Sequence, residues 1–282
     1  MAVTYTPWQI GDPLQQYGNG VVSGLQATED TGMDISVGSG TAKINGDFES
    51  DSSATLTVSA NASGSTRYDL VVARVEIGTT TASLEIKTGN LNPQQDATIW
   101  ELPLAMVTVA NGAVSITNAN IQDLRIIYGD LSEKLLVDVT NNADYTIGAG
   151  QEKTLAFNTV TTDLYRYGLL GSYLSPHVTA WYNIEVDMTW LPASATTKPV
   201  VFSVYVADGT TFSTKEIYRI SSAQTTAGNV QFAFDRNFFI KQGDFLYVSV
   251  KNTSDVDIDV KSIASTSPLF KMYITSYPLD VT

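Results

Sequence analysis

The stretch VTAWYNIEVDMTW, residues 178–190, decides the fold, because its apolar and polar residues alternate along its whole length. Successive side chains of a β-strand point to opposite faces of the sheet. A slip of one residue would bury Glu185 and Asp187, so the register of this strand is firmly specified. The face predicted to be buried carries Val178, Ala180, Tyr182, Ile184, Val186, Met188 and Trp190.

The rest of the second half repeats this period of two between segments rich in glycine, asparagine, threonine and proline. About eight strands result, which is the number in a jelly-roll sandwich. Besides 178–190, they are expected at 152–157, 200–207, 216–220, 230–234, 245–251, 256–260 and 270–277.

The first half is also β-rich, and we expect an N-terminal β-sandwich or barrel-like domain over residues 1–125. Alternation on both sides of Gly38 and Gly40 predicts a hairpin over 33–44. The strand at 68–77 is apolar on both faces and should be central. A short helix is expected from Asp12 to Gly18. Further strands are expected at 54–58, 83–87, 104–110 and 114–116.

Residues 126–140 are interpreted as a linker, in which Asp130 and Glu133 have the spacing of a capping box. This segment forms either a short helix or a pair of strands. The jelly-roll domain then covers 141–282, and the whole chain is all-β.

Composition excludes several classes of function. Of the 282 residues, 43% are hydrophobic and 16% charged, which is typical of a compact fold. The net charge of −13 disfavours nucleic acid and anionic lipid as partners. There is no cysteine and only one histidine, so we expect no cofactor. The N-terminal residues resemble no signal peptide, and no stretch is long enough for a membrane helix.

Two polar features, the single histidine and an acidic phrase, could indicate a catalytic or metal site. His177 follows Ser175 and Pro176, but there is no Gly-x-Ser-x-Gly motif, so we interpret it as a loop histidine and predict no catalytic residue. The alternating acids of the phrase DVDID could bind calcium, yet they lack the glycine turn of an EF-hand. The phrase more often marks an edge strand protected against pairing. Its acids are Asp255, Asp257 and Asp259.

Aromatic residues on the polar faces of strands are candidates for a subunit interface or a glycan contact. Trp181 lies close in sequence to Glu185 and Asp187, a pair of carboxylates whose spacing does not exclude glycosidase chemistry. On other strands the candidates are Tyr205, Phe245 and Tyr247.

Charges near the predicted core of the first domain need partners. For Asp69 and Arg125 we predict an ion pair with each other, against the alternative that both are separately solvated.

The first half resembles the N-terminal modules of bacteriophage tail, baseplate and fibre proteins over residues 17–125. The resemblance is carried by the order of five phrases. They are GVVSGL (20–25), GMDISVGSGTAKING (32–46), RYDLVVARV (67–75), PLAMVTVANGAVSI (103–116) and IQDLR (121–125).

The second half is similar to the jelly rolls of the tumour-necrosis-factor and complement-head type. The long aromatic strand after SPH and a hydrophobic–x–x–Gly–Asp–x–hydrophobic phrase carry this resemblance, which implies a homotrimer. The residues of the phrase are Ile240, Gly243, Asp244, Leu246, Val248 and Val250.

Together the resemblances imply a non-enzymatic bacteriophage virion protein of the tail tip, baseplate or short fibre, assembled in the host cytoplasm. The N-terminal domain would dock to other virion proteins, and the trimeric C-terminal domain would attach to a host-surface glycan. The alternatives are a head fibre or capsid decoration protein without receptor binding, and a polysaccharide depolymerase.

Overall fold

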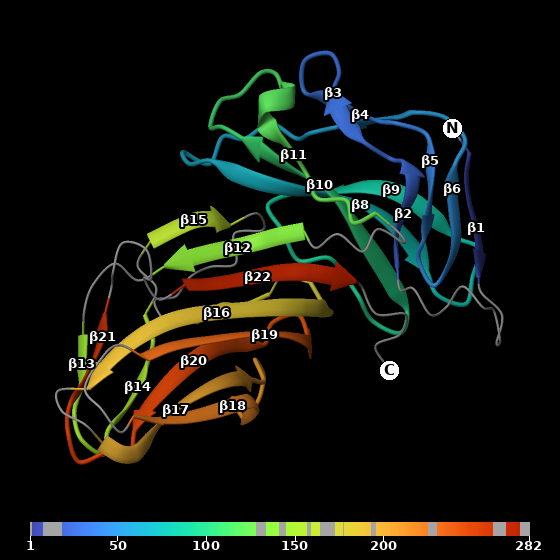
Figure 1. Cartoon of the computed structure of the whole chain (residues 1–282). Coiled ribbons are helices and arrows are strands. Elements are labelled where there is room, and N and C mark those ends of the chain that lie inside the picture. The colour runs from blue at the N-terminus through green and yellow to red at the C-terminus, as the bar shows by residue number, and fades with distance from the viewer. Residues whose placement is uncertain are drawn as a thin grey trace. The chain divides into compact units, whose positions relative to one another are not determined.

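The computed structural model consists of two compact units, one holding strands β1 to β11 and the other β12 to β22 (Figure 1). The structure describes residues 2–7, 19–127, 134–140, 145–156, 159–163, 173–176, 178–192, 196–224, 230–261 and 269–276. Within these ranges nearly all regular structure is antiparallel β, and the helical residues are confined to one 3₁₀ turn, Asn118–Asn120. The prediction of an all-β fold is confirmed.

Unit 1 contains three antiparallel sheets. The first has the order β1(Val3–Pro7), β6(Gly46–Ser50), β5(Gly40–Lys43), β2(Gly20–Gly24). The second has the order β3(Ala27–Glu29), β4(Asp34–Val37), β7(Ala54–Thr57). The third has the order β11(Ile121–Asp123), β10(Ile99–Val109), β8(Arg67–Glu76), β9(Ala82–Lys87).

The hairpin expected over residues 33–44 is wrong. Strand β4 pairs with β3 and β7, whereas β5 pairs with β2 and β6, so the chain passes between two sheets at Gly38 and Ser39. The turn lies earlier, at Gly32, whose φ is +64°. Gly40 is required by a close backbone approach, since a Cβ there would lie 2.2 Å from the Ser23 carbonyl oxygen.

Strand β8 lies between β10 and β9, which confirms the prediction that it is central. Leu70, Val71, Val72 and Ala73 along it are all fully buried, as expected of a strand covered on both faces. The strand expected at 114–116 does not form. Its first residue, Val114, is 83% exposed just after the turn at Gly112.

Unit 2 has two sheets that together form a jelly roll. One has the order β15(Thr159–Asp163), β12(Lys134–Thr140), β22(Leu269–Ser276), β16(Ala180–Pro192), β19(Val230–Ile240). In the same sheet β21(Ile258–Lys261) also pairs with β16, and β13(Tyr145–Ile147) pairs with β21. The other runs β14(Glu152–Thr154), β20(Phe245–Asn252), β17(Thr196–Ala207), β18(Thr214–Gln224). The eight principal strands, in chain order, are β12, β14, β16, β17, β18, β19, β20 and β22. The first, eighth, third and sixth of them (β12, β22, β16 and β19) lie in one sheet, and the other four lie in the second sheet. This interleaving defines the jelly roll.

The two sheets bury the faces that their alternation predicts. On β16, Ala180, Tyr182, Ile184 and Val186 are fully buried, whereas Trp181 is 43% exposed, so the predicted register is confirmed over these residues. The inner face of the other sheet consists of Phe202, Val204, Leu246, Val248 and Val250, each at most 1% exposed.

Residues 134–140, which the sequence analysis assigns to a linker, form strand β12 inside a sheet of unit 2, with Val137 and Val139 fully buried. The expected helix from Asp12 to Gly18 and His177 lie outside the described residues. In the described part of the chain, no helix has the length and apolar character needed to cross a membrane.

Candidate functional site

The outer face of the sheet formed by β14, β20, β17 and β18 carries a group of aromatic rings. Phe245 and Tyr247 alternate with the buried residues of β20 and therefore point outward. Tyr205 of β17 is the register partner of Tyr247, and Ala207 is the partner of Phe245. We call the outward aromatic residues of this sheet and its loops the aromatic face: Tyr173, Tyr205, Phe212, Phe245 and Tyr247.

The rings of the aromatic face contact one another in pairs. Tyr205 and Tyr247 are stacked, with ring centroids 5.0 Å apart and planes at 12°. Tyr173 meets Tyr247 edge-on at 5.3 Å. Phe212 lies nearly parallel to Phe245, with 6.4 Å between centroids. Such stacked and edge-to-face pairs are favourable arrangements of aromatic quadrupoles.

These rings border a hollow of about 340 Å³, which we call the aromatic hollow. Besides four of the rings, the small side chain of Ala207 and the hydroxyl-bearing Thr154 and Thr214 line it. The lining is therefore apolar with a few hydroxyl groups and includes no charged side chain. This composition is typical of small-molecule sites.

Phe212 is held at the rim of the aromatic hollow although it is 72% exposed. Its amide donates to the Asp208 carbonyl at 2.8 Å, and the Asp208 amide donates to the Ser213 carbonyl at 2.9 Å. Its φ of +55° lies in the left-handed region, which is costly for a bulky residue. The loop thus fixes an exposed ring in a strained conformation.

The Asp208 carboxylate organises the same loop from its inner side. It accepts hydrogen bonds from the Thr211 amide at 2.7 Å and the Thr210 amide at 2.9 Å. These bonds, that from Thr211 first, lower the pKa of Asp208 below its usual value. The loop is therefore ordered around an ionised carboxylate at neutral pH.

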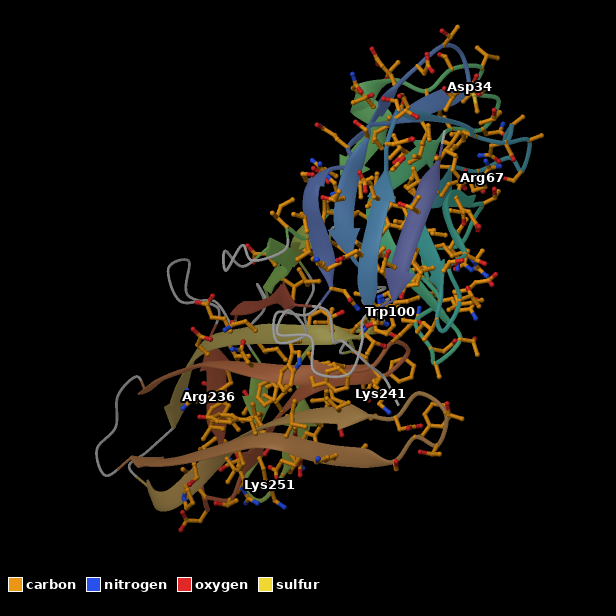
Figure 2. The ribbon with its side chains drawn as sticks, turned by 90° about the vertical axis from the view of Figure 1, so that its right-hand side faces the viewer. Asp34, Arg67, Trp100, Arg236, Lys241 and Lys251 are labelled. Carbon is orange, nitrogen blue, oxygen red and sulfur yellow. The ribbon has the colours of Figure 1, made fainter. Side chains whose placement is uncertain are left out.

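A smaller, polar hollow of about 80 Å³ lies on the same sheet face beyond Tyr205. The Ser249 hydroxyl donates to Glu152 Oε1 at 2.6 Å, and the Ser203 hydroxyl donates to Glu216. Each carboxylate also has a cation nearby: Lys251 is 4.0 Å from Glu152, and Arg219 is 3.9 Å from Glu216. Lys251, at the far end of β20, is labelled in Figure 2. The polar hollow thus presents donors and acceptors of both signs.

The aromatic candidates from the sequence are divided between the two sheets. Tyr205, Phe245 and Tyr247 come together, but Trp181 lies on β16 in the other sheet. Its ring is 5.6 Å from that of Phe239, its partner on β19. Both line a separate hollow of about 310 Å³ that also includes Lys215, Ile217 and Asn237. We call this the tryptophan hollow.

The DVDID segment does not form an alternating edge strand. Only Asp259 of the three acids lies in β21, which pairs with β13 on one side and β16 on the other. Asp259 accepts from the Thr146 hydroxyl at 2.6 Å, and Asp257 accepts from the Ala149 amide at 3.1 Å. Asp255 is exposed in the preceding turn. Among the described residues no three acids or histidines are grouped as a metal site.

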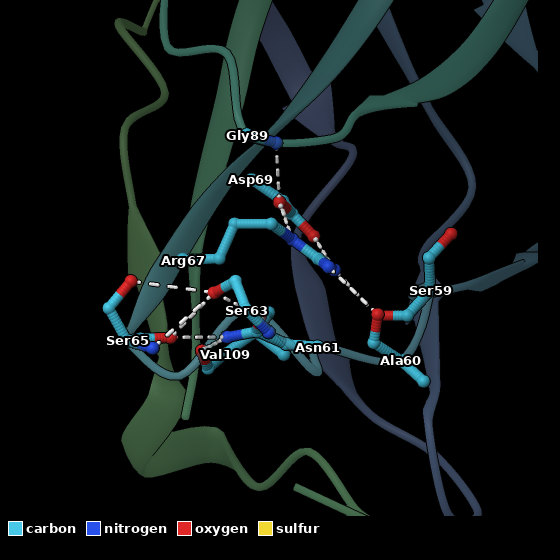
Figure 3. A network of polar contacts seen from close by, with 9 residues as sticks. All are labelled: Ser59, Ala60, Asn61, Ser63, Ser65, Arg67, Asp69, Gly89 and Val109. Atoms are coloured by element: carbon cyan, nitrogen blue, oxygen red, sulfur yellow. Dashed lines mark hydrogen bonds and ion pairs between the residues drawn. The ribbon is translucent and has the colours of Figure 1, made fainter. Parts of the chain in front are cut away.

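The predicted ion pair between Asp69 and Arg125 is wrong. Asp69 is fully buried and binds Arg67, with Oδ1 2.8 Å from Nε and Oδ2 2.9 Å from Nη2, and it also accepts from the Gly89 amide at 2.7 Å (Figure 3). Arg125 pairs with Asp123 at 2.7 Å. In both cases the partner is two residues away in sequence, a spacing that puts side chains of a strand on the same face. Glu185, one of the two carboxylates whose spacing does not exclude glycosidase chemistry, is half-buried. The side chain of the other, Asp187, lies outside the described residues.

Sequence reasoning missed five residues of the aromatic hollow: Thr154, Tyr173, Ala207, Phe212 and Thr214. Asp208 and Gly209, between two predicted strands, are a turn signal that could have placed Phe212 at a hairpin tip. Tyr173 reaches the sheet from a segment between strands β15 and β16, and no local pattern marks it.

Comparisons with known proteins give structural likeness only. No family model matches the chain, and no curated protein matches it. Among solved structures, it is similar to the Eiger TNF of S. frugiperda (TM-score 0.41, 11% identity, 53% of this chain and 98% of that one). It is also similar to the globular domain of zebrafish complement 1qA (TM-score 0.36, 10% identity, 51% and 99%) and to murine APRIL (TM-score 0.39, 10% identity, 50% and 98%). The strand order of unit 2, rather than these scores, defines the jelly roll.

Proposed function

We propose that the chain is a non-enzymatic structural protein of a bacteriophage virion, at the tail tip, the baseplate or a short fibre. Unit 1 docks to other virion proteins, and unit 2 attaches the particle to the host surface. The five ordered phrases of residues 17–125 support the first part. The aromatic face supports the second part and is the observation that carries the proposal.

The aromatic face, with Tyr173 and Phe212 exposed and its other three rings half-buried, requires an explanation. Large apolar residues dominate binding energetics because they bury much surface, and they are enriched where proteins meet ligands or partners. The five rings of the aromatic face are collected on the outer side of one sheet, where the jelly-roll core does not need them. A binding role accounts for their position, whereas a purely structural role does not.

Self-association of unit 2 as a homotrimer is the second part of the proposal, and the tryptophan hollow supports it. Trp181 is 43% and Phe239 37% exposed, and the two rings are bordered by the polar side chains of Lys215, Glu216 and Asn237. An apolar centre with a polar rim is the usual composition of an interface between subunits. Three copies would then give avidity to individually weak contacts.

The trimer is tested by sedimentation velocity on the full chain. We expect the wild-type chain to sediment as a trimer and Trp181→Ala to shift it towards the monomer. Phe212→Ala removes an exposed ring from the other sheet and should leave the trimer intact. A monomeric wild-type chain, or a trimer insensitive to Trp181→Ala, would contradict this part.

Attachment is tested by adding the fluorescently labelled full chain to host cells and by imaging the particle. Saturable cell binding and a tail location support the proposal. A head location without cell binding would favour a capsid decoration protein instead. Turnover of capsular polysaccharide that is lost in Glu185→Gln would indicate a depolymerase.

A further inference from the structure

We propose that the aromatic hollow of unit 2 is a binding site for an uncharged saccharide, with the polar groups of the smaller hollow beside it hydrogen-bonding the next sugar residue. This inference deepens the proposed attachment function and rests on it. The occupant is deduced from three properties of the site: its size, the chemistry of its lining and the balance of charge around it.

The size of the hollow fits a small ligand rather than a protein surface. Its volume of about 340 Å³ is near the lower end of the roughly 300–1,000 Å³ typical of ligand pockets. Phe245 and Tyr247 are two residues apart on β20, so they rise from the sheet about 7 Å apart. A single pyranose ring is a group of suitable size for such a space.

The lining offers both kinds of contact that a sugar needs. The C–H face of a pyranose packs on aromatic rings, and Tyr247 and Phe212 each present one at the hollow. The hydroxyl groups of a sugar need hydrogen-bonding partners, which Thr154 and Thr214 provide at the same hollow.

The balance of charge favours an uncharged sugar over an acidic one. The polar hollow beside the aromatic face holds two opposed pairs, Glu152 with Lys251 and Glu216 with Arg219, and the Phe212 loop adds the negative charge of Asp208. Because each cation faces a carboxylate, the two pairs present no net charge to an incoming anion. The chain as a whole carries −13, which repels anions further. Paired donors and acceptors suit the hydroxyl and acetamido groups of hexoses and N-acetylhexosamines.

The strain at Phe212 agrees with a binding role. A bulky residue with φ of +55° costs stability, and no core packing is gained by it, since the ring is 72% exposed. The cost is explained if the ring is held ready for a ligand, because a preorganised contact does not have to be ordered on binding.

The test begins with a printed array of bacterial oligosaccharides containing hexose, N-acetylhexosamine or uronic acid residues, probed with the labelled full chain. The uncharged disaccharide giving the strongest signal is then titrated into the wild-type chain by calorimetry. We expect Tyr247→Ala to abolish the heat and Phe212→Gly to weaken binding at least tenfold. Trp181→Ala is the matched control and should keep the affinity for the free disaccharide, although its array signal falls with the loss of avidity.

Phe212→Gly separates binding from folding. Glycine adopts a positive φ without strain, so this variant should unfold at the wild-type temperature or above it. Weaker binding by a chain of undiminished stability therefore reports loss of the ring. Unchanged binding in both Phe212→Gly and Tyr247→Ala would overturn the inference, as would absence of any array signal or a preference for the uronic acids.

The same variants distinguish failure of this inference from failure of the proposed function. If the wild-type chain binds host cells and both variants bind equally well, attachment stands and the saccharide site is elsewhere. If the disaccharide binds as expected but the chain does not bind cells, the site stands and host attachment is refuted.

Discussion

The two units use their charged and aromatic side chains in opposite ways. In unit 1, Asp69 and Glu101 are 0% and 1% exposed and are held by arginine or lysine. In unit 2, the ion pairs of the aromatic-face sheet lie at the surface, and the rings of Tyr173 and Phe212 are exposed. Unit 1 thus buries carboxylates that hold its strands together, whereas the ion pairs of the aromatic-face sheet in unit 2 lie at the surface.

Buried charge in unit 1 specifies which strands pair and in what register. Glu101 of β10 binds Arg74 of β8 at 2.8 Å and Lys87 of β9 at 2.5 Å, so one carboxylate joins three strands. It also accepts from the Gln94 amide at 2.6 Å. A shifted register would leave this carboxylate buried without partners, which is strongly unfavourable.

The largest expected effect is therefore on unit 1. Glu101→Ala removes the shared partner of Arg74 and Lys87 and should lower its free energy of unfolding by about 3–5 kcal/mol. Urea denaturation followed by circular dichroism measures this. The control is Asp47→Ala, which removes a 58% exposed partner of Lys43 and should cost about 1 kcal/mol or less. Equal losses in the two variants would abolish the distinction between buried and exposed charge in unit 1.

The second prediction concerns a feature that the two units share. Asn61 and Asn252 are both buried residues of an Asn-x-Ser turn, and each Oδ1 accepts from the amide and hydroxyl of the serine two residues on. Asn252 Nδ2 donates to three carbonyls, those of Ile147, Gly148 and Val256. Asn61 Nδ2 donates to two, those of Ser65 and Val109 (Figure 3).

Replacing either asparagine by alanine removes these hydrogen bonds together with the acceptor of the serine amide and hydroxyl, at about 1–3 kcal/mol for each variant. We expect Asn252→Ala to cost more than Asn61→Ala, because its side-chain amide makes three contacts with carbonyls rather than two. Asn111→Ala, at an exposed turn, is the control and should cost about 0.5 kcal/mol. Thermal unfolding of the three variants decides the order, and a greater loss in Asn61→Ala would show that the number of carbonyls is not what matters.

The sequence predicts strands well and their partners poorly. The alternation of β16 fixes which side chains are buried, because a slip would bury charge, and the structure agrees. Around Gly38 the same kind of alternation identifies both strands but says nothing of which sheet each joins. That choice depends on the close approach of Gly40 to Ser23, a contact that no local pattern records.

In the candidate site, too, the strand residues could be predicted and the loop residues could not. Tyr205, Phe245 and Tyr247 could be predicted because each occupies the polar face of a strand. Phe212 and Tyr173 complete the aromatic hollow from loops, whose course depends on tertiary contacts. The buried pair of Arg67 and Asp69 was within reach of the sequence, since residues two apart on a strand share a face.

The smallest effect compares a buried tyrosine of unit 1 with the exposed tyrosines of unit 2. Tyr5 is 4% exposed and donates to the Asn45 carbonyl at 3.0 Å. Burial, and then the Asp47 carboxylate, raise the pKa of Tyr5 to about 12. Between pH 10 and 12 the unfolded chain therefore loses this phenolic proton while the folded chain keeps it. The stability that Tyr5 contributes is complete below pH 10 and is lost as the pH rises through 12.

Tyr5→Phe should cost about 1 kcal/mol at pH 8, the net value of one hydrogen bond. The difference between the two chains should shrink above pH 10, because the phenylalanine cannot ionise in either state. Urea denaturation of both chains at pH 8, 10 and 11 measures the trend, and Tyr205→Phe, a partly exposed tyrosine of the aromatic face, is the control. A difference independent of pH would mean that Tyr5 ionises as readily in the folded chain as in the unfolded one, and the contrast between a closed unit 1 and an open face on unit 2 would not extend to their tyrosines.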